Sequence, residues 1–402
     1  MKKIIIGSIL LLSILACGKK EDTEIKEVKD YSWEKVKENS KETQVNIYMW
    51  GGSSQINSFM DKVIAKNLEE DNKIILNRVP IVDIKDTVNK LIVEKQAEKK
   101  DGSVDILWVN GENYKALKEA NVLWQGFTDK LPNLEYVNEK TLATDFGESI
   151  EGREAPFGEA QFNFVYDSTK TEKPFVNYET LKKYVVANPK VFTYPAIPDF
   201  TGSAFVRNIV IDMLGEDINS MSEKDFKLAL EPVWDYLNEI EPYLWREGKT
   251  YPESSGKLDT LYKNGEVGVT MGYSVNKAAN KVAVGEFKDT SRSFLLNRGT
   301  LFNNHYLAIP MNASNKNGAL YVINYLISSE AQILKQDPSN WGDFNILDIN
   351  KISLEDKESL SELSTSVYTV PLEELAKKRV SELSPAKLEI IEEGWLKNVG
   401  KN

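Results

Sequence analysis

The chain has 402 residues, 61 of them acidic and 50 lysine or arginine, which gives a net charge of −11 at neutral pH. This negative balance disfavours a nucleic-acid surface or an anionic membrane surface as the partner. A single histidine and a single cysteine exclude zinc-protease spacing and an internal disulfide.

The N-terminus predicts export. Residues 1–16 have two lysines followed by "IIIGSILLLSILA", an apolar run too short to span a bilayer, and read as a signal peptide. The letters "ILAC" resemble a bacterial lipobox, which would make Cys17 the lipidated N-terminus; an ordinary signal peptide with an incidental cysteine is the alternative. Residues 17–44 are charged and predict a tether, although Tyr31 to Val36 could dock as a helical turn.

From residue 45 onwards strands and helices alternate. Strands are expected at 45–49, 73–79, 104–109, 162–168, 265–273 and 304–312, and helices near 56–64, 88–92, 201–214, 223–239, 318–328 and in the tail from 371. This order predicts an α/β fold with a mostly parallel sheet covered on both faces, and the length of the body predicts two domains. Pro371 and Pro385 are expected in first helical turns.

Three loops carry groups suited to a small polar ligand. "WGGSSQIN" and "NGEN" follow predicted strands, and "YPAIPDFTGSAF" delivers an aromatic, proline-stiffened loop to a helix that should end at Gly215. Ligands of open α/β sheets bind beyond the carboxyl ends of the strands. Each loop can equally be read as a turn with a helix cap.

Catalytic motifs are missing from the sequence. It contains no nucleophile elbow and no phosphate-binding loop, and its acidic residues fall on solvated helix faces. The sequence therefore favours a protein that is not an enzyme.

Four segments resemble successive landmarks of bacterial extracellular solute-binding proteins, the capture subunits of ABC importers. They are "GEAQFNFVYDSTK", "YPAIPDFTGSAFVRNIV", "LYKNGEVGVTMGYS" and "YLAIPMNASNKNGALYVINYLISSEAQ". With "LWVNGENYKALKEANVLWQGF", the chain is similar to the YnjB-like branch, whose relatives include thiamine- and iron-binding proteins. The resemblance covers residues 45 to about 342.

The resemblance implies a two-lobed periplasmic-binding-protein fold of type II, with a mostly parallel sheet in each lobe and ligand held between them. Lobe 1 would comprise 45–156 and 303–341, and lobe 2 would comprise 157–299 and 342–402. It also implies an ABC permease and ATPase as partners, a lipid-anchored monomer facing the periplasm or the exterior, no cofactor and no metal.

Carried over by motif, the candidate ligand-binding residues come from both lobes and the hinge. They are Trp50, Gly51, Ser53, Ser54, Asn110, Gly111, Glu112, Asn113, Gln161, Asp199, Phe200, Thr201, Gly202, Ser203, Trp245, Tyr273, Ser274, Asn304, His305, Tyr306 and Trp341. Aromatic faces would stack on a ring or a cation, and free amides of Gly202 to Ala204 would cradle an anionic group. Glu112 and Asp199 would meet a positive charge.

The ligand itself stays open at this level. No "YY" pair occurs, which disfavours ferric iron, whereas a thiamine-like compound, an anion-bearing solute or a sugar each fits part of the predicted site. A surface-anchored enzyme or adhesin on the same scaffold is the alternative class. Phe200→Ala and Gly202→Asp are both expected to weaken binding in a folded protein.

Overall fold

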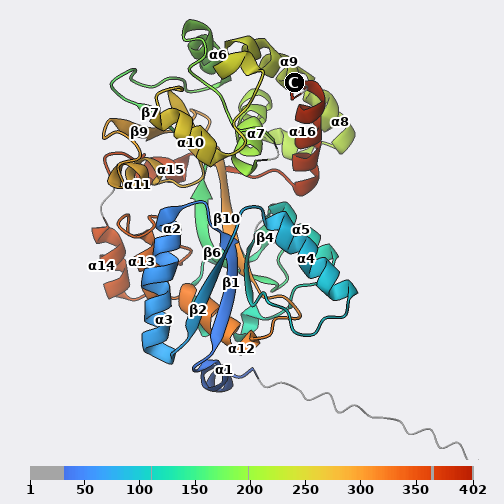
Figure 1. Ribbon diagram of the computed structural model, residues 1–402, viewed down its shortest axis with the longest axis vertical. Helices are drawn as coiled ribbons and strands as arrows, with labels where there is room; N and C mark the ends of the chain where they lie inside the picture. Colours follow the sequence, from blue (N-terminus) through green and yellow to red (C-terminus); the bar gives the residue numbers. More distant parts are fainter. Residues whose placement is uncertain (1–30, 110, 198, 364–365, 401–402) are drawn as a thin grey trace, which may run out of the picture.

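The computed structural model describes residues 31–109, 111–197, 199–363 and 366–400. The predicted signal peptide, the predicted lipidation site Cys17 and the first part of the predicted tether lie outside the described residues. Figure 1 shows two bodies, here called the first lobe (lower) and the second lobe (upper), joined by a waist that β6 (Glu154–Gln161) and β10 (Thr300–Ala308) run along.

The first lobe is built on one large mixed sheet. Its strand order is β11-β10-β3-β1-β2, and β6 pairs with β10. The other strands are β1 (Gln44–Trp50), β2 (Ile75–Ile81), β3 (Ile106–Val109) and β11 (Arg379–Ser381). β1 runs parallel to β2 and β3, whereas β10 runs antiparallel to β3 and β6. The carboxyl ends of β1 and β3 therefore point towards the waist.

Helices cover both faces of this sheet. They are α1 (Trp33–Ser40), α2 (Ser54–Ser58), α3 (Ala65–Asn72), α4 (Ile84–Gln96), α5 (Gly111–Glu119), α12 (Lys316–Leu326), α13 (Ser329–Gln336) and α14 (Leu354–Glu362). A π-helical segment, Phe59–Ile64, joins α2 to α3, and a short hairpin of β4 (Thr144–Asp145) and β5 (Glu148–Ser149) precedes β6. Short 3-10 turns lie at Thr128–Lys130, Pro132–Tyr136 and Glu139–Leu142.

The second lobe packs helices around a small sheet of order β8-β7-β9. Its strands are β7 (Asn163–Asp167), β8 (Val269–Gly272) and β9 (Ser291–Phe294). Its helices are α6 (Tyr178–Ala187), α7 (Phe200–Leu214), α8 (Glu223–Ala229), α9 (Glu231–Ile240), α10 (Ser255–Lys263), α11 (Lys277–Ala283), α15 (Leu372–Lys377) and α16 (Pro385–Asn398), with 3-10 turns at Glu216–Ser220, Glu241–Tyr243 and Trp245–Gly248. α7 is almost wholly buried at the centre of this lobe.

The hinge is held by backbone pairing and by two buried amides. β6 and β10 pair from Gln161 opposite Phe302 down to Glu154 opposite Ala308. The Gln161 side chain donates to the Lys378 carbonyl at 2.8 Å, and the Asn163 amide donates to the carbonyls of Gly272 and Ser274. These bonds fix the point at which the first crossing enters the second lobe.

Most predicted elements are confirmed, and the differences have clear causes. α7 ends at Leu214, and Gly215 follows it as the C-cap with a φ of 86°, which suits glycine. The helix predicted over 223–239 is two helices, because Pro232 starts a new one at α9. Pro385 lies in the first turn of α16 as predicted, but Pro371 stands one residue before α15. In the second lobe the parallel prediction is wrong for the described strands, since β7 pairs antiparallel with both neighbours.

The expected domain boundaries shift at two places. Residues 33–40 of the predicted tether form α1, which buries Val36 against the core that α12 shares. α14 packs against α13, so residues up to about 362 lie with the first lobe and not the second. The other boundaries stay predictions. Among the described residues no helix has the length and apolarity to cross a bilayer.

Candidate functional site

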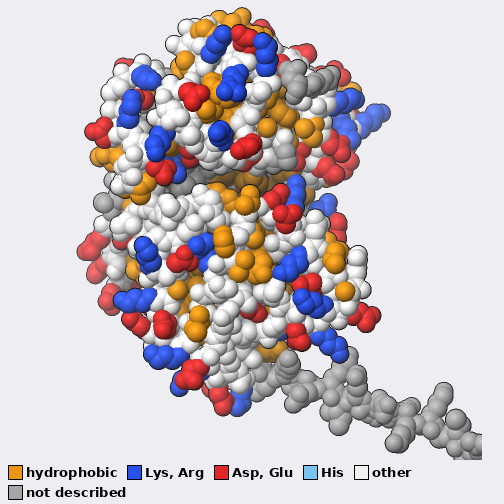
Figure 2. Space-filling view, in the orientation of Figure 1, with side chains coloured by type: hydrophobic (Ala, Val, Ile, Leu, Met, Phe, Trp, Pro, Cys, Tyr) orange, Lys and Arg blue, Asp and Glu red, His pale blue; other side chains and the backbone are white. Residues whose placement is uncertain are grey.

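The candidate site lies at the waist, where the ends of sheet strands in the first lobe approach helix starts in the second. β1 and β3 run into α2 and α5 on the first lobe. Tyr273 lies between the start of α7 and the hinge. Its ring contacts Phe200 of α7, and its backbone carbonyl accepts a hydrogen bond from the Gln161 amide. Figure 2 shows the narrowing between the lobes, with hydrophobic side chains gathered along it.

The start of α7 is capped by its own chain. The Asp199 carboxylate accepts hydrogen bonds from the amides of Thr201 at 2.9 Å and Gly202 at 3.0 Å, and the Ser203 amide bonds the Asp199 carbonyl. Burial raises the pKa of Asp199, while these amides act to lower it. The prediction of free amides is therefore wrong: a capping carboxylate already occupies the positive end of this helix. Because the Asp199 carboxylate already accepts these hydrogen bonds, it is not a free charge available to pair with a cationic ligand.

Gly202 is a packing glycine. A Cβ added there would lie 2.2 Å from the Pro195 carbonyl oxygen and 3.0 Å from that of Ala196. Backbone atoms cannot move aside as a flexible side chain does. The expectation that Gly202→Asp leaves the protein folded is therefore withdrawn.

Gly202→Ala is instead expected to lower the free energy of unfolding by about 1–3 kcal/mol, the usual cost of overpacking a buried site. Urea unfolding would measure it. Gly256→Ala is the matched control, because the added methyl in α10 meets only the Ser254 hydroxyl, 3.9 Å away. That control should be neutral or slightly stabilising. Equal midpoints for wild type and Gly202→Ala would contradict the packing role.

Behind the capped helix start, an aromatic ring covers a buried ion pair. Phe200 is 39 % exposed, and its ring centroid lies 5.1 Å from that of Tyr273 and 5.4 Å from the Arg207 guanidinium. Arg207 is fully buried and lies 3.2 Å from Glu382, within ion-pair range. Glu382 also accepts hydrogen bonds from the Tyr273 hydroxyl and from Asn303, the latter at 3.0 Å. The second lobe therefore presents the Phe200 ring above the buried Arg207, whose charge is balanced by Glu382.

The first lobe presents a second exposed aromatic side chain. Trp50 ends β1 and is 42 % exposed, with its indole folded over Gly52, where any Cβ would collide with the ring. Ser53 caps α2 by accepting from the Ile56 amide, and Ser54 opens that helix. The Gly51 carbonyl accepts from Asn57. The loop therefore forms a turn with a helix cap, one of the two interpretations of the sequence, and Trp50 projects from it.

The start of α5 is also occupied by a carboxylate. The Gly111 amide donates to Asp145, a buried residue of the β4–β5 hairpin, and Gly111 has a φ of 57°. Glu154 is buried nearby, at 0 % exposure. Burial raises the pKa of both carboxyls well above their usual range, and the negative charge of Asp145 adds to the rise at Glu154. Sequence reasoning missed both acids, and it missed Arg207 and Glu382.

His305 and Trp341 are brought together, but inside the first lobe. Their rings stack with centroids 5.6 Å apart, and both side chains are buried. His305 Nε2 lies 3.1 Å from the Asp343 carboxylate, which is 3.0 Å from the fully buried Lys335 ammonium. Burial and the nearby Lys335 charge lower the pKa of His305 despite the opposing effect of Asp343. This cluster ties α13 to the hinge, since Lys335 also donates to the Phe157 carbonyl.

The remaining candidates are mostly packed. Asn113, Gln161, Thr201, Ser203 and Tyr306 are buried, Tyr273, Ser274 and Asn304 are half-buried, and Trp245 packs under Arg246 on the second-lobe core. Asn110 and the side chain of Glu112 lie outside the described residues. Ligand contact by these residues stays a prediction. Within the described ranges no cluster of three or more metal-ligating side chains occurs.

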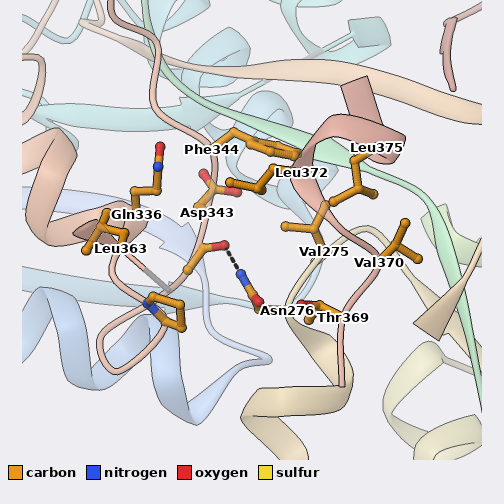
Figure 3. Close-up of a pocket in the computed structure, with 12 residues that line it drawn as sticks. Val275, Asn276, Gln336, Asp343, Phe344, Leu363, Thr369, Val370, Leu372 and Leu375 are labelled. Atoms are coloured by element: carbon orange, nitrogen blue, oxygen red, sulfur yellow. Dashed lines mark hydrogen bonds between the residues drawn. The ribbon is translucent and has the colours of Figure 1, made fainter. Parts of the chain in front are cut away.

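A pocket opens between the lobes beside the hinge (Figure 3). Gln336, Asp343 and Phe344 line it from the first lobe, and apolar residues around α15 line it from the second. The Asn276 amide at the start of α11 donates to the Gly342 carbonyl and bridges the two lobes. The lining contains none of the candidate residues, although Asp343 connects it to the His305 cluster.

Comparison with known proteins decides the family. The chain is 37 % identical over 334 residues to protein YnjB of Escherichia coli (strain K12), covering 82 % of this chain and 86 % of that protein. The chain belongs to the YnjB family. No family model matches the sequence.

Solved structures similar to this YnjB-family chain share its fold. An ABC transporter from Clostridium perfringens matches at a TM-score of 0.60 and 18 % identity, covering 89 % of this chain and 99 % of its own. The periplasmic binding protein AfuA from Actinobacillus pleuropneumoniae, with fructose-6-phosphate bound, matches at 0.62 and 14 %, covering 90 % and 99 %. A periplasmic thiamin binding protein matches at 0.59 and 14 %, covering 89 % and 95 %.

The two-lobed fold predicted from the sequence is therefore confirmed. In fold, the chain is similar to solved structures that are named as an ABC transporter and as periplasmic binding proteins. One of these neighbours is named as a thiamin binding protein and another contains fructose-6-phosphate, so the fold leaves the ligand open.

Proposed function

We propose that this YnjB-family protein is the capture subunit of an ABC importer and binds one small polar organic solute between its lobes. The observation that carries the proposal is the pair of exposed aromatic side chains, Trp50 and Phe200, one on each lobe at the waist. Exposed aromatic rings beside buried polar groups are typical of small-ligand sites. A permease and an ATPase would receive the solute, and a lipid on Cys17 would hold the protein at the membrane.

The ligand classes considered from the sequence are a thiamine-like compound, an anion-bearing solute and a sugar. The relatives that bind thiamin and fructose-6-phosphate make the first two reasonable members of a screen. A surface-anchored enzyme or adhesin stays the alternative class, and no cluster among the described residues favours it.

A thermal-shift screen of the purified mature protein tests the proposal. A ligand that binds only the folded state raises the melting temperature by mass action, and about 100 times its Kd adds about 2.7 kcal/mol. The screen should contain thiamine, putrescine, spermidine, inorganic phosphate, fructose 6-phosphate and glucose. A concentration-dependent rise with one chemical class is expected. Flat melting temperatures with all classes, and no permease or ATPase gene beside this one, would overturn the proposal.

A further inference from the structure

We propose that a small set of contacts on one side of the waist, here called the inter-lobe latch, holds the two lobes together in the resting molecule. The latch consists of Asn276 and Asn280 of the second lobe and the segment 341–344 of the first lobe. These are contacts of the protein with itself, so the inference goes beyond the proposed function and can be tested with no ligand.

Two side-chain amides of the second lobe form the polar part of the latch. The Asn276 amide donates to the Gly342 carbonyl, and the Asn280 amide donates to the Trp341 carbonyl at 3.1 Å. The Asn280 backbone amide bonds the Asn276 carbonyl, so the two residues are one helical turn apart and their side chains leave the same face of α11. One turn of α11 therefore lies against two successive carbonyls of the first lobe.

Each side of the latch is bonded to its own lobe. The Gly342 amide donates to the Lys335 carbonyl of α13 at 2.9 Å. The Lys277 ammonium, at the first position of α11, lies 2.7 Å from the Asp259 carboxylate of α10. Hydrogen bonds between the two sides therefore join the lobes themselves. A rotation of one lobe that separates these atoms beyond about 3.5 Å breaks both bonds.

Position 342 has to be glycine for the latch to form. Gly342 has a φ of 76°, and a Cβ added there would lie 2.9 Å from Asn276 Cγ and 3.1 Å from Asn276 Cβ. A larger residue would be strained at this φ and would push the Asn276 side chain away from the carbonyl. The backbone of the first lobe is thus shaped to receive this amide.

The apolar part of the latch is Phe344. This first-lobe side chain forms a buried cluster with Val275, Leu295, Val370 and Leu375 of the second lobe. Figure 3 shows several of these side chains around the pocket beside the hinge. Separating the lobes here would expose apolar surface to water, which the hydrophobic effect opposes.

The latch lies next to both loops that carry the exposed aromatic side chains. On the first lobe, the Gln55 amide of α2 donates to the Pro338 carbonyl at 3.2 Å, shortly before the latch segment. On the second lobe, Tyr273 packs its ring on Phe200 and precedes Asn276 by three residues. The latch therefore holds the two loops at a fixed spacing in the resting molecule.

The distance between two spin labels, one on each lobe, tests the inference. The chain has one cysteine, so in Cys17→Ser protein the introduced cysteines are the only thiols. Lys66→Cys on α3 and Val284→Cys after α11 place the labels at exposed positions. Double electron-electron resonance without ligand should give one main distance for this labelled parent.

Asn276→Ala combined with Asn280→Ala should release the latch. The ratio of the longer to the main distance should rise about ten-fold or more, because two hydrogen bonds that join the lobes are lost. Asn280→Ala alone should raise the same ratio by a smaller factor. Far-ultraviolet circular dichroism should match the parent, since each lobe keeps its own core.

Two further variants separate the latch from general effects. The Asn188 amide donates to the Tyr184 carbonyl at 3.0 Å within the second lobe, so Asn188→Ala removes the same kind of bond and should keep the parent distance. Gly342→Ala should lengthen the distance by displacing Asn276. Added to Asn276→Ala, it should change the distance little further, because both changes break one contact.

Three results overturn the inference. One is the parent distance distribution in the folded variant that lacks both latch amides. Another is the same lengthening in Asn188→Ala. The third is a parent in which the longer distance is the main population. Each result is read without a solute, so none of them bears on the proposed capture function.

Discussion

Replacing Arg207 by methionine is expected to lower the free energy of unfolding by about 3–5 kcal/mol, because it leaves the Glu382 carboxylate buried without its counter-charge. Arg207 is fully buried, lies 3.2 Å from Glu382, and donates to Ser203 at 2.8 Å and to Tyr273 at 3.2 Å. Burial lowers the pKa of Arg207, but Glu382 and Tyr273 raise it more, so the guanidinium stays charged. Urea unfolding would measure the loss.

The double variant Arg207→Met with Glu382→Gln is the control for this pair. Removing both charges should recover much of the stability, because the uncompensated carboxylate is gone. A wild-type urea midpoint for Arg207→Met alone would show that the ion pair between Arg207 on α7 and Glu382 in the C-terminal segment does not stabilise the fold. A double variant as unstable as the sum of the singles would show that the two charges act independently.

Lys335→Met is expected to cost a similar amount, about 3–5 kcal/mol near pH 8. The ammonium is fully buried and donates to the Asp343 carboxylate at 3.0 Å and to the carbonyls of Phe157 at 2.8 Å and Phe344 at 2.6 Å. Burial lowers the pKa of Lys335, and the Asp343 charge offsets part of that effect. Without Lys335, His305 is the remaining group able to hold a positive charge beside Asp343.

Because the chain has a single histidine, NMR can follow the titration of His305 in the wild type and in Lys335→Met. In the wild type, burial and the Lys335 charge hold the pKa of His305 below its usual value, and in Lys335→Met the repelling charge is gone, so the pKa should rise. A histidine whose pKa is lower in the folded state than in the unfolded state costs stability as pH falls below the unfolded value, and that cost shrinks when the folded pKa rises. The variant should therefore lose less stability at pH 5.5 than at pH 8. An unshifted histidine titration would contradict the cluster.

Hydrophobic periodicity in the sequence was enough to predict the parallel strands of the large first-lobe sheet and the central helix α7 of the second lobe. α7 has buried residues at nearly every position and stops just before Gly215, and the apolar spacing with a following glycine was enough to predict it. The direction of strand pairing in the second lobe could not be predicted, because β7 pairs with β8 and β9, which lie far from it in the chain. Local patterns carry no information about such pairing.

The site was predicted less completely than the fold for the same reason. The loops around Trp50 and Phe200 were found because aromatic and glycine-rich segments at strand or helix ends are local signals. Asp145, Glu154 and Glu382 have ordinary sequence neighbours, and only the fold buries each of them. Arg207 offered one usable signal, a charge within the apolar run "FVRNIV", which predicts a buried partner for it.

Calorimetric titration of two aromatic variants tests the central claim, capture of a small solute at the waist. The probe is the compound that raises the melting temperature of the wild type. The wild type should bind it with a stoichiometry of one, and Trp50→Ala and Phe200→Ala should each weaken binding about ten-fold, since each loses an aromatic contact. Leu228→Ala, at a 59 % exposed position on α8, should bind like the wild type. Unchanged affinity in both aromatic variants would contradict a ligand site at the waist.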